Sequence, residues 1–298
     1  MSEPALLYVV GATKAGTSWL YRALHDHPDC APRAVKEAHY WDTFDAESRA
    51  KQLIAFNKRL FEYQASRAEA QAQERQWQVA NMDRRIADMT GLIAAIAGDR
   101  TGDAAYRRWL TDGTEGRLPA DMTPGYSVLP VPMLERMAAL SPRALFVFLI
   151  REPLARLWSH IRMQAERFRQ AHEVFEEKAN NILWRILHKG QETHILERGD
   201  YPATVARLRA AVPAARLHVA YCERLFTQAG FAEMCAFLGI RPLTVDGTER
   251  VHEGPRATMR DDLRPKAVRL LRGHYDWAAR EVGPLPQAWA DNLERGAA

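Results

Sequence analysis

The feature that most restricts the fold is an apolar segment followed at once by a glycine-containing loop and a helix. Residues 5–10 are rich in Val and Leu, which is typical of a buried parallel strand. A loop follows over Gly11–Ser18, and residues 20–24 then place their apolar side chains on one helix face before Pro28. This order points free backbone N–H groups and the positive helix end at one place. The sequence therefore predicts an anion-binding loop after the first strand.

The loop reads GATKAGTS and resembles the P-loop of nucleotide-triphosphate-binding proteins, Gly-x4-Gly-Lys-Ser/Thr. Thr17 occupies the place of the P-loop lysine, whereas Lys14 supplies a lysine three residues earlier. A standard Mg-ATP site is therefore not expected. The loop instead predicts an anion-binding site whose positive side chain is Lys14. Taken alone, the loop is also compatible with a glycine-rich turn that carries a surface lysine.

Two later apolar segments indicate how the sheet is built. Residues 144–150 (ALFVFLI) predict a central strand, and a helix is expected from about Pro153 because proline suits the first helical turn. Residues 217–221 predict a third strand. Strands that alternate with helices favour an α/β fold, here a three-layer sandwich with a central parallel sheet like that of P-loop NTPases. We expect one domain over residues 1–298 with a helical insertion at about 46–112.

Composition and charge exclude several classes of protein. The chain has 298 residues, 47% of them hydrophobic and 26% charged, which is ordinary for a globular protein. Its net charge of +4 suits an anionic ligand but is too small to predict nucleic-acid binding. No apolar run reaches the length of about 18 residues that a membrane span needs. The first ten residues lack a cationic signal-peptide region, so we expect a cytoplasmic location.

A second candidate anion site follows the strand at 144–150. Arg151 stands at the carboxyl end of that strand, where α/β sheets bind ligands. Ser159 lies roughly opposite the apolar stripe of the following helix and is free to face a ligand. A guanidinium fork and a hydroxyl can together hold a phosphate. The alternative is an arginine that caps a neighbouring helix and a solvated serine.

Together, these two elements resemble the sulfotransferases that use 3′-phosphoadenosine 5′-phosphosulfate (PAPS). Further segments are similar to landmarks of the heparan-sulfate-type and related bacterial enzymes. They are Val35–Asp42 (VKEAHYWD), Thr123–Ser127 (TPGYS), Arg198–Tyr201 (RGDY) and Leu217–Leu225 (LHVAYCERL).

The resemblance implies roles for particular residues. It places the 5′-phosphosulfate on the first loop and the 3′-phosphate on Arg151 and Ser159. The positions expected to contact the cofactor are Lys14, Ala15, Gly16, Thr17, Ser18, Trp19, Arg151 and Ser159. Arg256, in the sequence GPR, is the nearest counterpart of a Lys-Gly-Arg loop that touches the cofactor in many relatives. PAP, the 3′,5′-bisphosphate, is the expected product. No metal is expected, because transfer of this kind depends on positioning and charge stabilisation and the sequence has no His, Cys and carboxylate cluster with ligand spacing.

The same resemblance implies Glu37 as the general base and Lys14 as the cation that stabilises the leaving phosphate and the transition state. His39 would point the same way as Glu37 in an extended segment and could assist the base or bind the acceptor. Nearby lysines lower the pKa of Glu37 and burial raises it, and the sequence leaves open which effect is larger. The alternative is a surface ion pair between Glu37 and Lys36.

The sequence does not identify the acceptor or the oligomeric state. A small molecule, a glycan or a lipid remains possible as the acceptor. Two other functions stay open: a P-loop kinase or NTPase, which the missing lysine disfavours, and a non-catalytic nucleotide-binding scaffold that docks a partner through the helical insertion.

Overall fold

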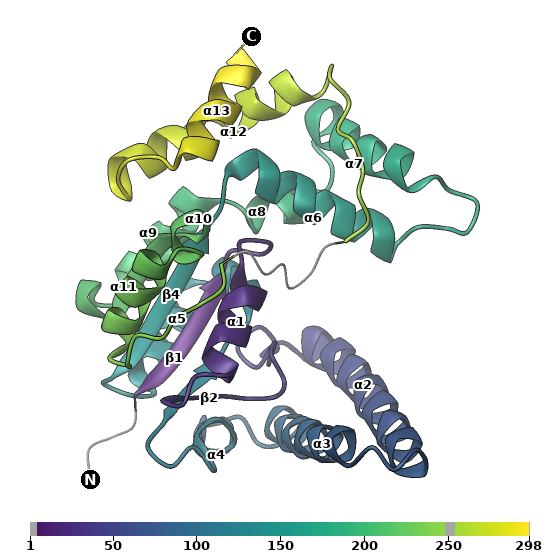
Figure 1. Ribbon diagram of the computed structural model, residues 1–298, viewed down its shortest axis with the longest axis vertical. Coiled ribbons are helices and arrows are strands. Elements are labelled where there is room, and N and C mark those ends of the chain that lie inside the picture. The colour runs from purple at the N-terminus through teal and green to yellow at the C-terminus, as the bar shows by residue number, and fades with distance from the viewer. Residues whose placement is uncertain (1–4, 248–253, 298) are drawn as a thin grey trace.

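Five parallel strands form the centre of the computed structural model, which describes residues 5–247 and 254–297 (Figure 1). Their order across the sheet is β2-β3-β1-β4-β5. The strands are β1 (Leu6–Gly11), β2 (Cys30–Pro32), β3 (Leu118–Asp121), β4 (Ala144–Ile150) and β5 (Leu217–Tyr221). Because all strands are parallel, their carboxyl ends meet at one edge of the sheet, where the loops after β1 and β4 are neighbours.

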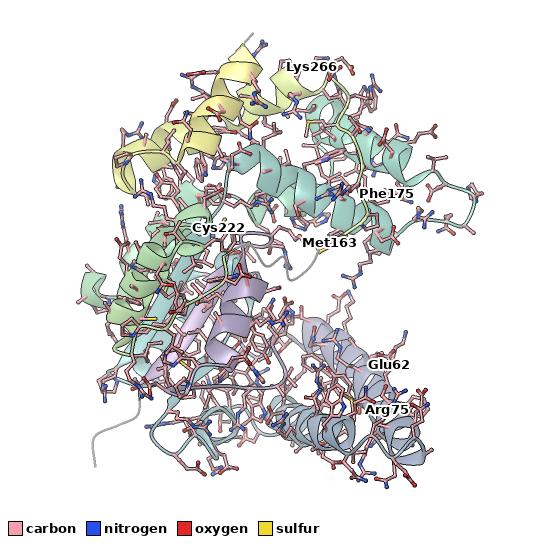
Figure 2. The ribbon with its side chains drawn as sticks, viewed as in Figure 1. Glu62, Arg75, Met163, Phe175, Cys222 and Lys266 are labelled. Atoms are coloured by element: carbon pink, nitrogen blue, oxygen red, sulfur yellow. The ribbon has the colours of Figure 1, made fainter. Side chains whose placement is uncertain are left out.

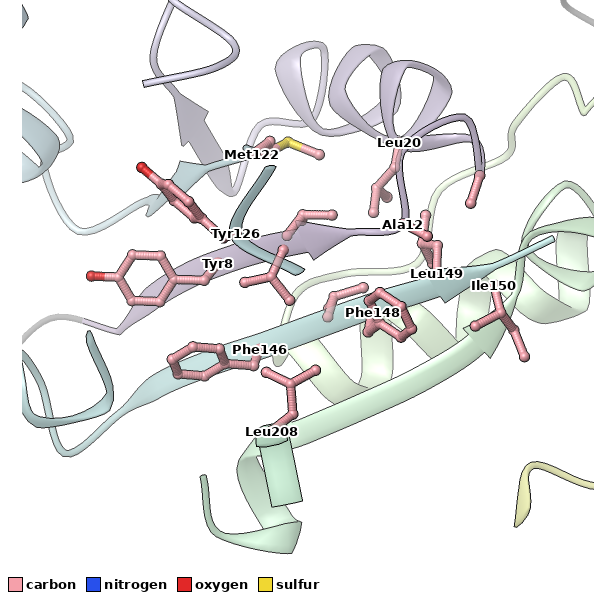
Figure 3. Close-up of a cluster of buried hydrophobic side chains, with 14 of the residues drawn as sticks. Tyr8, Ala12, Leu20, Met122, Tyr126, Phe146, Phe148, Leu149, Ile150 and Leu208 are labelled. Carbon is pink, nitrogen blue, oxygen red and sulfur yellow. The ribbon is translucent and has the colours of Figure 1, made fainter. Parts of the chain in front are cut away.

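β1 is buried along its whole length, and β4 is buried except at the half-buried Leu145, because helices cover both faces of the sheet. β1 pairs with β4 in a register that sets Tyr8 beside Phe146, with ring centroids 5.1 Å apart. Figure 3 shows these rings together with Phe148, Leu149 and Leu20 in one apolar cluster. This core fixes the ends of β1 and β4, and therefore the positions of the loops that follow them.

The helices that flank or extend the sheet follow the strands along the chain. They are α1 (Thr17–His25), α5 (Val131–Ala139), α6 (Pro153–Arg167), α7 (Phe175–Lys189), α8 (Thr193–Glu197), α9 (Tyr201–Ala211), α10 (Cys222–Leu225), α11 (Gln228–Leu238), α12 (Arg264–Glu281) and α13 (Gln287–Ala297). Short 3₁₀ turns occupy η1 (Pro124–Val128) and η2 (Ala214–Arg216). α6 begins directly after β4, as its proline predicts, and Glu152 caps it by accepting from the N–H groups of Leu154 and Ala155.

Three helices fall within the range where the sequence predicts an insertion. α2 (Ala46–Ala72) and α3 (Gln76–Ala97) form an antiparallel hairpin that extends from the sheet, and α4 (Ala104–Thr111) leads the chain back to β3 (Figure 1). α2 starts at Asp45, whose side chain accepts from the N–H of Ser48. α2 packs on α3, and Phe56 on α2 is buried.

The predicted α/β fold with a central parallel sheet is confirmed, and the expected strands lie at 6–11, 144–150 and 217–221. The sequence analysis did not predict β2 and β3. They have three and four residues, and each contains a proline, so neither carries a hydrophobic pattern long enough to stand out. Among the described residues, no helix is both long and apolar enough to cross a membrane.

Candidate functional site

The loop after β1 presents unpartnered backbone N–H groups. Gly16 is the N-cap of α1, no side chain caps this end, and the first helical hydrogen bond runs from the N–H of Leu20 to the Gly16 carbonyl at 3.1 Å. The N–H groups of residues 16–19 therefore have no partner inside the helix. Ala15 differs, because its N–H donates to the Ala12 carbonyl at 3.1 Å. The geometry is that of an anion site formed by residues 16–19.

The backbone of this loop is held in an unusual conformation. Gly16 has a φ of 86°, and a Cβ atom there would lie 3.0 Å from the Phe226 ring and 3.3 Å from the Cys222 Cβ, so only glycine fits. Figure 2 shows Cys222 beside the loop. Lys14 also has a positive φ, 71°, although it is not glycine. Such conformations are costly and concentrate at functional sites.

The second predicted element meets the first. Arg151, directly after β4, donates from Nη1 to the carbonyl of Lys14 at 3.2 Å. Tyr201 holds the backbone of Arg151 by donating to its carbonyl at 2.7 Å. Ser159 lies on α6, two turns from Arg151, and is 9% exposed. The structure therefore places the lysine loop and the arginine in direct contact across 137 positions of sequence.

Cations gather around Lys14. Burial lowers the pKa of Lys14, and the positive charges of Arg151, Arg162 and Lys36 lower it further, while Glu37 acts in the opposite direction. A partly buried site with this excess of positive charge is suited to a ligand that carries several negative charges.

Trp19 and Arg256, which the sequence analysis also expects to contact the cofactor, differ from the other predicted residues in their surroundings. Trp19 buries its indole against Phe226, with ring centroids 5.2 Å apart, and donates from Nε1 to the Asp246 carbonyl at 3.3 Å, so only its backbone N–H faces the anion site. Arg256 belongs to a segment that runs along α6. That segment is fixed on either side of Arg256, since Arg162 donates to the Pro255 carbonyl and Trp158 to the Ala257 carbonyl.

Glu37 and its neighbours connect to the anion loop through Lys36. The Lys36 Nζ donates to the Ser18 Oγ at 3.0 Å and to the Glu37 Oε1 at 3.3 Å. Burial raises the pKa of Glu37, but the hydrogen bond from His39 and the charge of Lys36 outweigh it and lower this pKa to about 2. The sequence left open whether burial or the neighbouring charges dominate the pKa of Glu37. The neighbouring charges dominate, and Glu37 is ionised at neutral pH.

His39 lies between two carboxylates. Its Nδ1 is 2.7 Å from the Asp42 Oδ2, and its Nε2 is 3.5 Å from the Glu37 Oε2. Burial lowers the pKa of His39, but bonding to Asp42 and Glu37 outweighs it and raises the pKa to about 9. The expectation of an extended segment here is wrong, because the backbone turns at His39 with a φ of 49°. The turn, rather than strand alternation, brings His39 to Glu37.

This arrangement predicts how stability depends on pH. A group whose folded-state pKa is raised stabilises the fold below its unfolded pKa of about 6.5, and that contribution disappears as the pH rises through its folded value. In urea unfolding, His39→Gln is therefore expected to lower the free energy of unfolding by up to about 3 kcal/mol at pH 6. The deficit should shrink steadily towards pH 9. The matched variant His172→Gln removes an exposed imidazole and should change little. A deficit that grows with pH would contradict the assignment of His39 as a cation between two carboxylates.

Two functional-site residues were missed by the sequence analysis. Asp42 fixes His39, and η1 packs against the pair so closely that a Cβ on Gly125 would lie 3.1 Å from the Asp42 Oδ2. Asp121, at the end of β3, is buried. It is connected through two hydroxyl groups to the segment that carries Glu37 and His39. Asp42 and Asp121 both lie within or beside the quoted motifs, but only tertiary contacts reveal what they bind.

Asp121 is the centre of a buried hydrogen-bond network. Its carboxylate accepts from the Thr123 Oγ1 at 2.6 Å, the Tyr106 OH at 2.7 Å and the Tyr126 OH at 2.9 Å. Two of these hydroxyls accept in turn from the segment that carries Glu37 and His39. Thr123 accepts from the N–H of Ala38, and Tyr126 from the N–H of Tyr40, each at 2.9 Å.

The site so assembled contains an anion loop, a cluster of cations and an ionised carboxylate held by an imidazolium. Within residues 5–247 and 254–297, no group of three or more His, Cys, Asp or Glu side chains is placed to hold a metal ion.

Comparison with known proteins connects this geometry to a family. The family model described as "Sulfotransferase family" matches residues 5–241. Among solved structures, a sulfotransferase from Alicyclobacillus acidocaldarius superimposes with a TM-score of 0.60 at 21% identity, over 97% of this chain and all of that one. Two others have TM-scores below 0.5 and 16% identity. The sulfotransferase domain from the curacin biosynthetic pathway (0.47) covers 96% of this chain and 100% of its own. The domain from the Synechococcus PCC 7002 olefin synthase (0.44) covers 96% of each chain.

No curated protein sequence matches the chain. The family model nevertheless spans the anion loop, Glu37, Arg151, Ser159 and the whole central sheet. The chain therefore belongs to the sulfotransferase family.

Proposed function

We propose that this chain transfers a sulfuryl group from PAPS to a hydroxyl or amine of a small-molecule, glycan or lipid acceptor. The observation that carries the proposal is the hydrogen bond from Arg151 to the Lys14 carbonyl, which puts the two predicted anion-binding elements in contact. A nucleotide with a phosphosulfate at one end and a phosphate at the other needs two such sites. The family to which the chain belongs supports a transferase, and the excess of cations around Lys14 supports the donor.

The residues suited to the donor divide into two groups. The N–H groups of residues 16–19 and the Lys14 ammonium would hold the 5′-phosphosulfate. Arg151 and Ser159 would hold the 3′-phosphate, and Arg256 lies on a segment fixed beside the helix that carries Ser159. When bound, PAPS supplies the sulfuryl group, and its bridging oxygen keeps the electron pair of the broken S–O bond.

The chain's own residues then move one proton and neutralise charge. Glu37 accepts the proton that the acceptor oxygen or nitrogen loses as its bond to sulfur forms. His39, bound to Asp42, keeps the Glu37 carboxylate in place. Negative charge bound near Glu37 would raise its low pKa and make it a better base. Lys14 and the loop N–H groups stabilise the charge that develops on the leaving oxygen. Transfer reactions of this kind depend on positioning and charge stabilisation.

A ligand-binding experiment tests the donor assignment. Adenosine 3′,5′-bisphosphate is expected to raise the Tm and to saturate in calorimetry, whereas Mg-ATP should do neither. Arg151→Ala should weaken bisphosphate binding by about 10- to 100-fold, because it removes charge-assisted hydrogen bonds of about 1.5–3 kcal/mol each.

The control is Arg59→Ala, which removes an exposed arginine from α2. Equal bisphosphate affinity in Arg151→Ala and wild type would refute the 3′-phosphate assignment. Stabilisation by Mg-ATP alone would favour a nucleotide kinase or NTPase. Once the donor is established, a screen of acceptors with radiolabelled PAPS identifies the substrate.

A further inference from the structure

The outer face of α2 carries an apolar stripe that no other part of residues 5–247 and 254–297 covers. Ile54 and Phe61 are 72% and 71% exposed, the highest values among the large apolar side chains together with Trp77. They are seven residues apart and therefore lie on the same side of the helix. The alanines at positions 50, 65 and 68 continue the stripe at spacings of three and four residues, and all of them are exposed.

The stripe lies opposite the face that packs on α3. The side chains turned towards α3 recur at positions 53, 56, 60, 63 and 67, each buried or half-buried. In a helix of 3.6 residues per turn, positions 54 and 61 lie well over 90° around from this inner face. Figure 2 labels Glu62 on α2 and Arg75 at the turn between α2 and α3, at the end of the hairpin that lies away from the sheet.

The apolar stripe and the charged residues beside it would match those of a second copy of α2 that runs in the opposite direction. Phe61 lies near the middle of the stripe; of the other members, the bulky Ile54 lies in the N-terminal half, and Ala65 and Ala68 lie in the C-terminal half. The flank beside the stripe carries Lys51 and Lys58 in the first half and Glu62 and Glu69 in the second half. Among the described residues, Lys58 and Glu62 make no ion pair of their own.

We propose that the outer face of α2 binds the same face of a second copy in an antiparallel, two-fold symmetric dimer. The two-fold axis passes near position 60. Ile54 then lies against Ala65 of the partner subunit, and Ala50 against Ala68 of the partner subunit. Phe61 lies near the axis and packs on the stem of the partner subunit's Lys58. A self-complementary patch of this kind forms a closed dimer.

The same pairing gives the flanking charges opposite partners. Lys58 faces Glu62 of the partner subunit, and the two-fold axis repeats this pair. Lys51 faces Glu69 of the partner subunit. In the single chain Lys51 donates to Glu47 on the surface, and the contact with the partner would replace this hydrogen bond. A parallel pairing would instead set this flank against the opposite side of the partner's stripe, so the lysines and the glutamates of the two flanks would not meet. The charge order along α2 therefore selects the antiparallel arrangement.

Sedimentation equilibrium of the full chain over a wide concentration range tests the dimer. The weight-average mass is expected to rise from that of one chain, 33.8 kDa, towards twice this value. Lys58→Glu should raise the dissociation constant by at least about tenfold, because two repulsive pairs form across the axis. Adding Glu62→Lys to Lys58→Glu should restore the dimer. Phe61→Glu should abolish it, and since Phe61 is exposed this variant should keep the wild-type circular dichroism spectrum.

Arg59→Glu is the matched control. It reverses an exposed charge on the same helix but away from the stripe, and should leave the dissociation constant unchanged. A wild-type chain that stays monomeric throughout would overturn the proposal. So would an equal loss of dimer in Lys58→Glu and Arg59→Glu, or a failure of the double variant to recover. The test is independent of catalysis, so it stands or falls separately from the proposed donor.

Discussion

Replacing Lys14 by alanine is expected to lower kcat by about 10²–10³-fold, the range seen when one preorganised donor to a developing negative charge is removed. Lys14 is the cation that the loop after β1 presents, and its positive φ fixes its backbone in one conformation. The loop N–H groups remain in the variant. Bisphosphate binding should therefore weaken much less than turnover, and KM for the donor should change by a smaller factor than kcat.

The measurement is steady-state sulfuryl transfer to the acceptor that the screen identifies, with bisphosphate affinity determined in parallel. Lys189→Ala, which removes an exposed lysine at the end of α7, is the control and should be as active as wild type. Lys14→Ala should fold normally, since burial and three neighbouring cations already disfavour the charged form of this side chain. Unchanged turnover would remove Lys14 from the mechanism. A loss of bisphosphate affinity and a rise in KM for the donor, with kcat unchanged, would assign it to binding alone.

The sequence was sufficient for the features that local patterns encode. A continuous apolar run predicts a buried strand whatever lies elsewhere in the chain, and both β1 and β4 were predicted in this way; the glycine that follows β1 also predicts its tight turn. The contact between Arg151 and the Lys14 loop was predictable for the same reason, because the carboxyl ends of parallel strands meet at one sheet edge.

What the sequence could not predict depends on contacts between distant segments. The role of Asp42 arises because the backbone turns at His39, and no alternation rule anticipates a positive φ at a histidine. The sign of the Glu37 pKa shift depends on how burial compares with two neighbouring charges, which only positions in space decide. Asp121 acts through hydroxyls from α4 and η1, and its own segment, Leu118–Asp121, is too short to stand out as a strand.

Asp121→Asn is expected to reduce both stability and turnover. The buried carboxylate accepts from three hydroxyls, and its neutral replacement loses the charge in each of these bonds and offers one acceptor oxygen instead of two. Buried polar groups left without partners cost about 1–3 kcal/mol each, so urea unfolding should show a loss of about 2–4 kcal/mol. This is a large part of the total stability of an ordinary domain, about 5–15 kcal/mol.

The effect on turnover follows from what the network holds. Thr123 and Tyr126 bind the backbone of the Glu37–Tyr40 segment, and both lose the charged acceptor that orients their hydroxyls. A displacement of about 1 Å at a reacting group can cost about 100-fold in rate, so kcat should fall strongly. Bisphosphate binding should stay close to wild type, because the anion loop lies on β1 and α1 rather than on this segment.

Asp261→Asn, which neutralises an exposed carboxylate before α12, is the control for the loss of charge and should match wild type in both measurements. The decisive comparison is the ratio of the kcat loss to the loss in bisphosphate affinity at a temperature where Asp121→Asn is fully folded. If both fall together, the substitution disturbs the whole site and Asp121 has no specific role in positioning Glu37. If kcat alone falls, the buried carboxylate of β3 acts on catalysis through two hydroxyls and the backbone beside Glu37, without itself touching the reacting atoms.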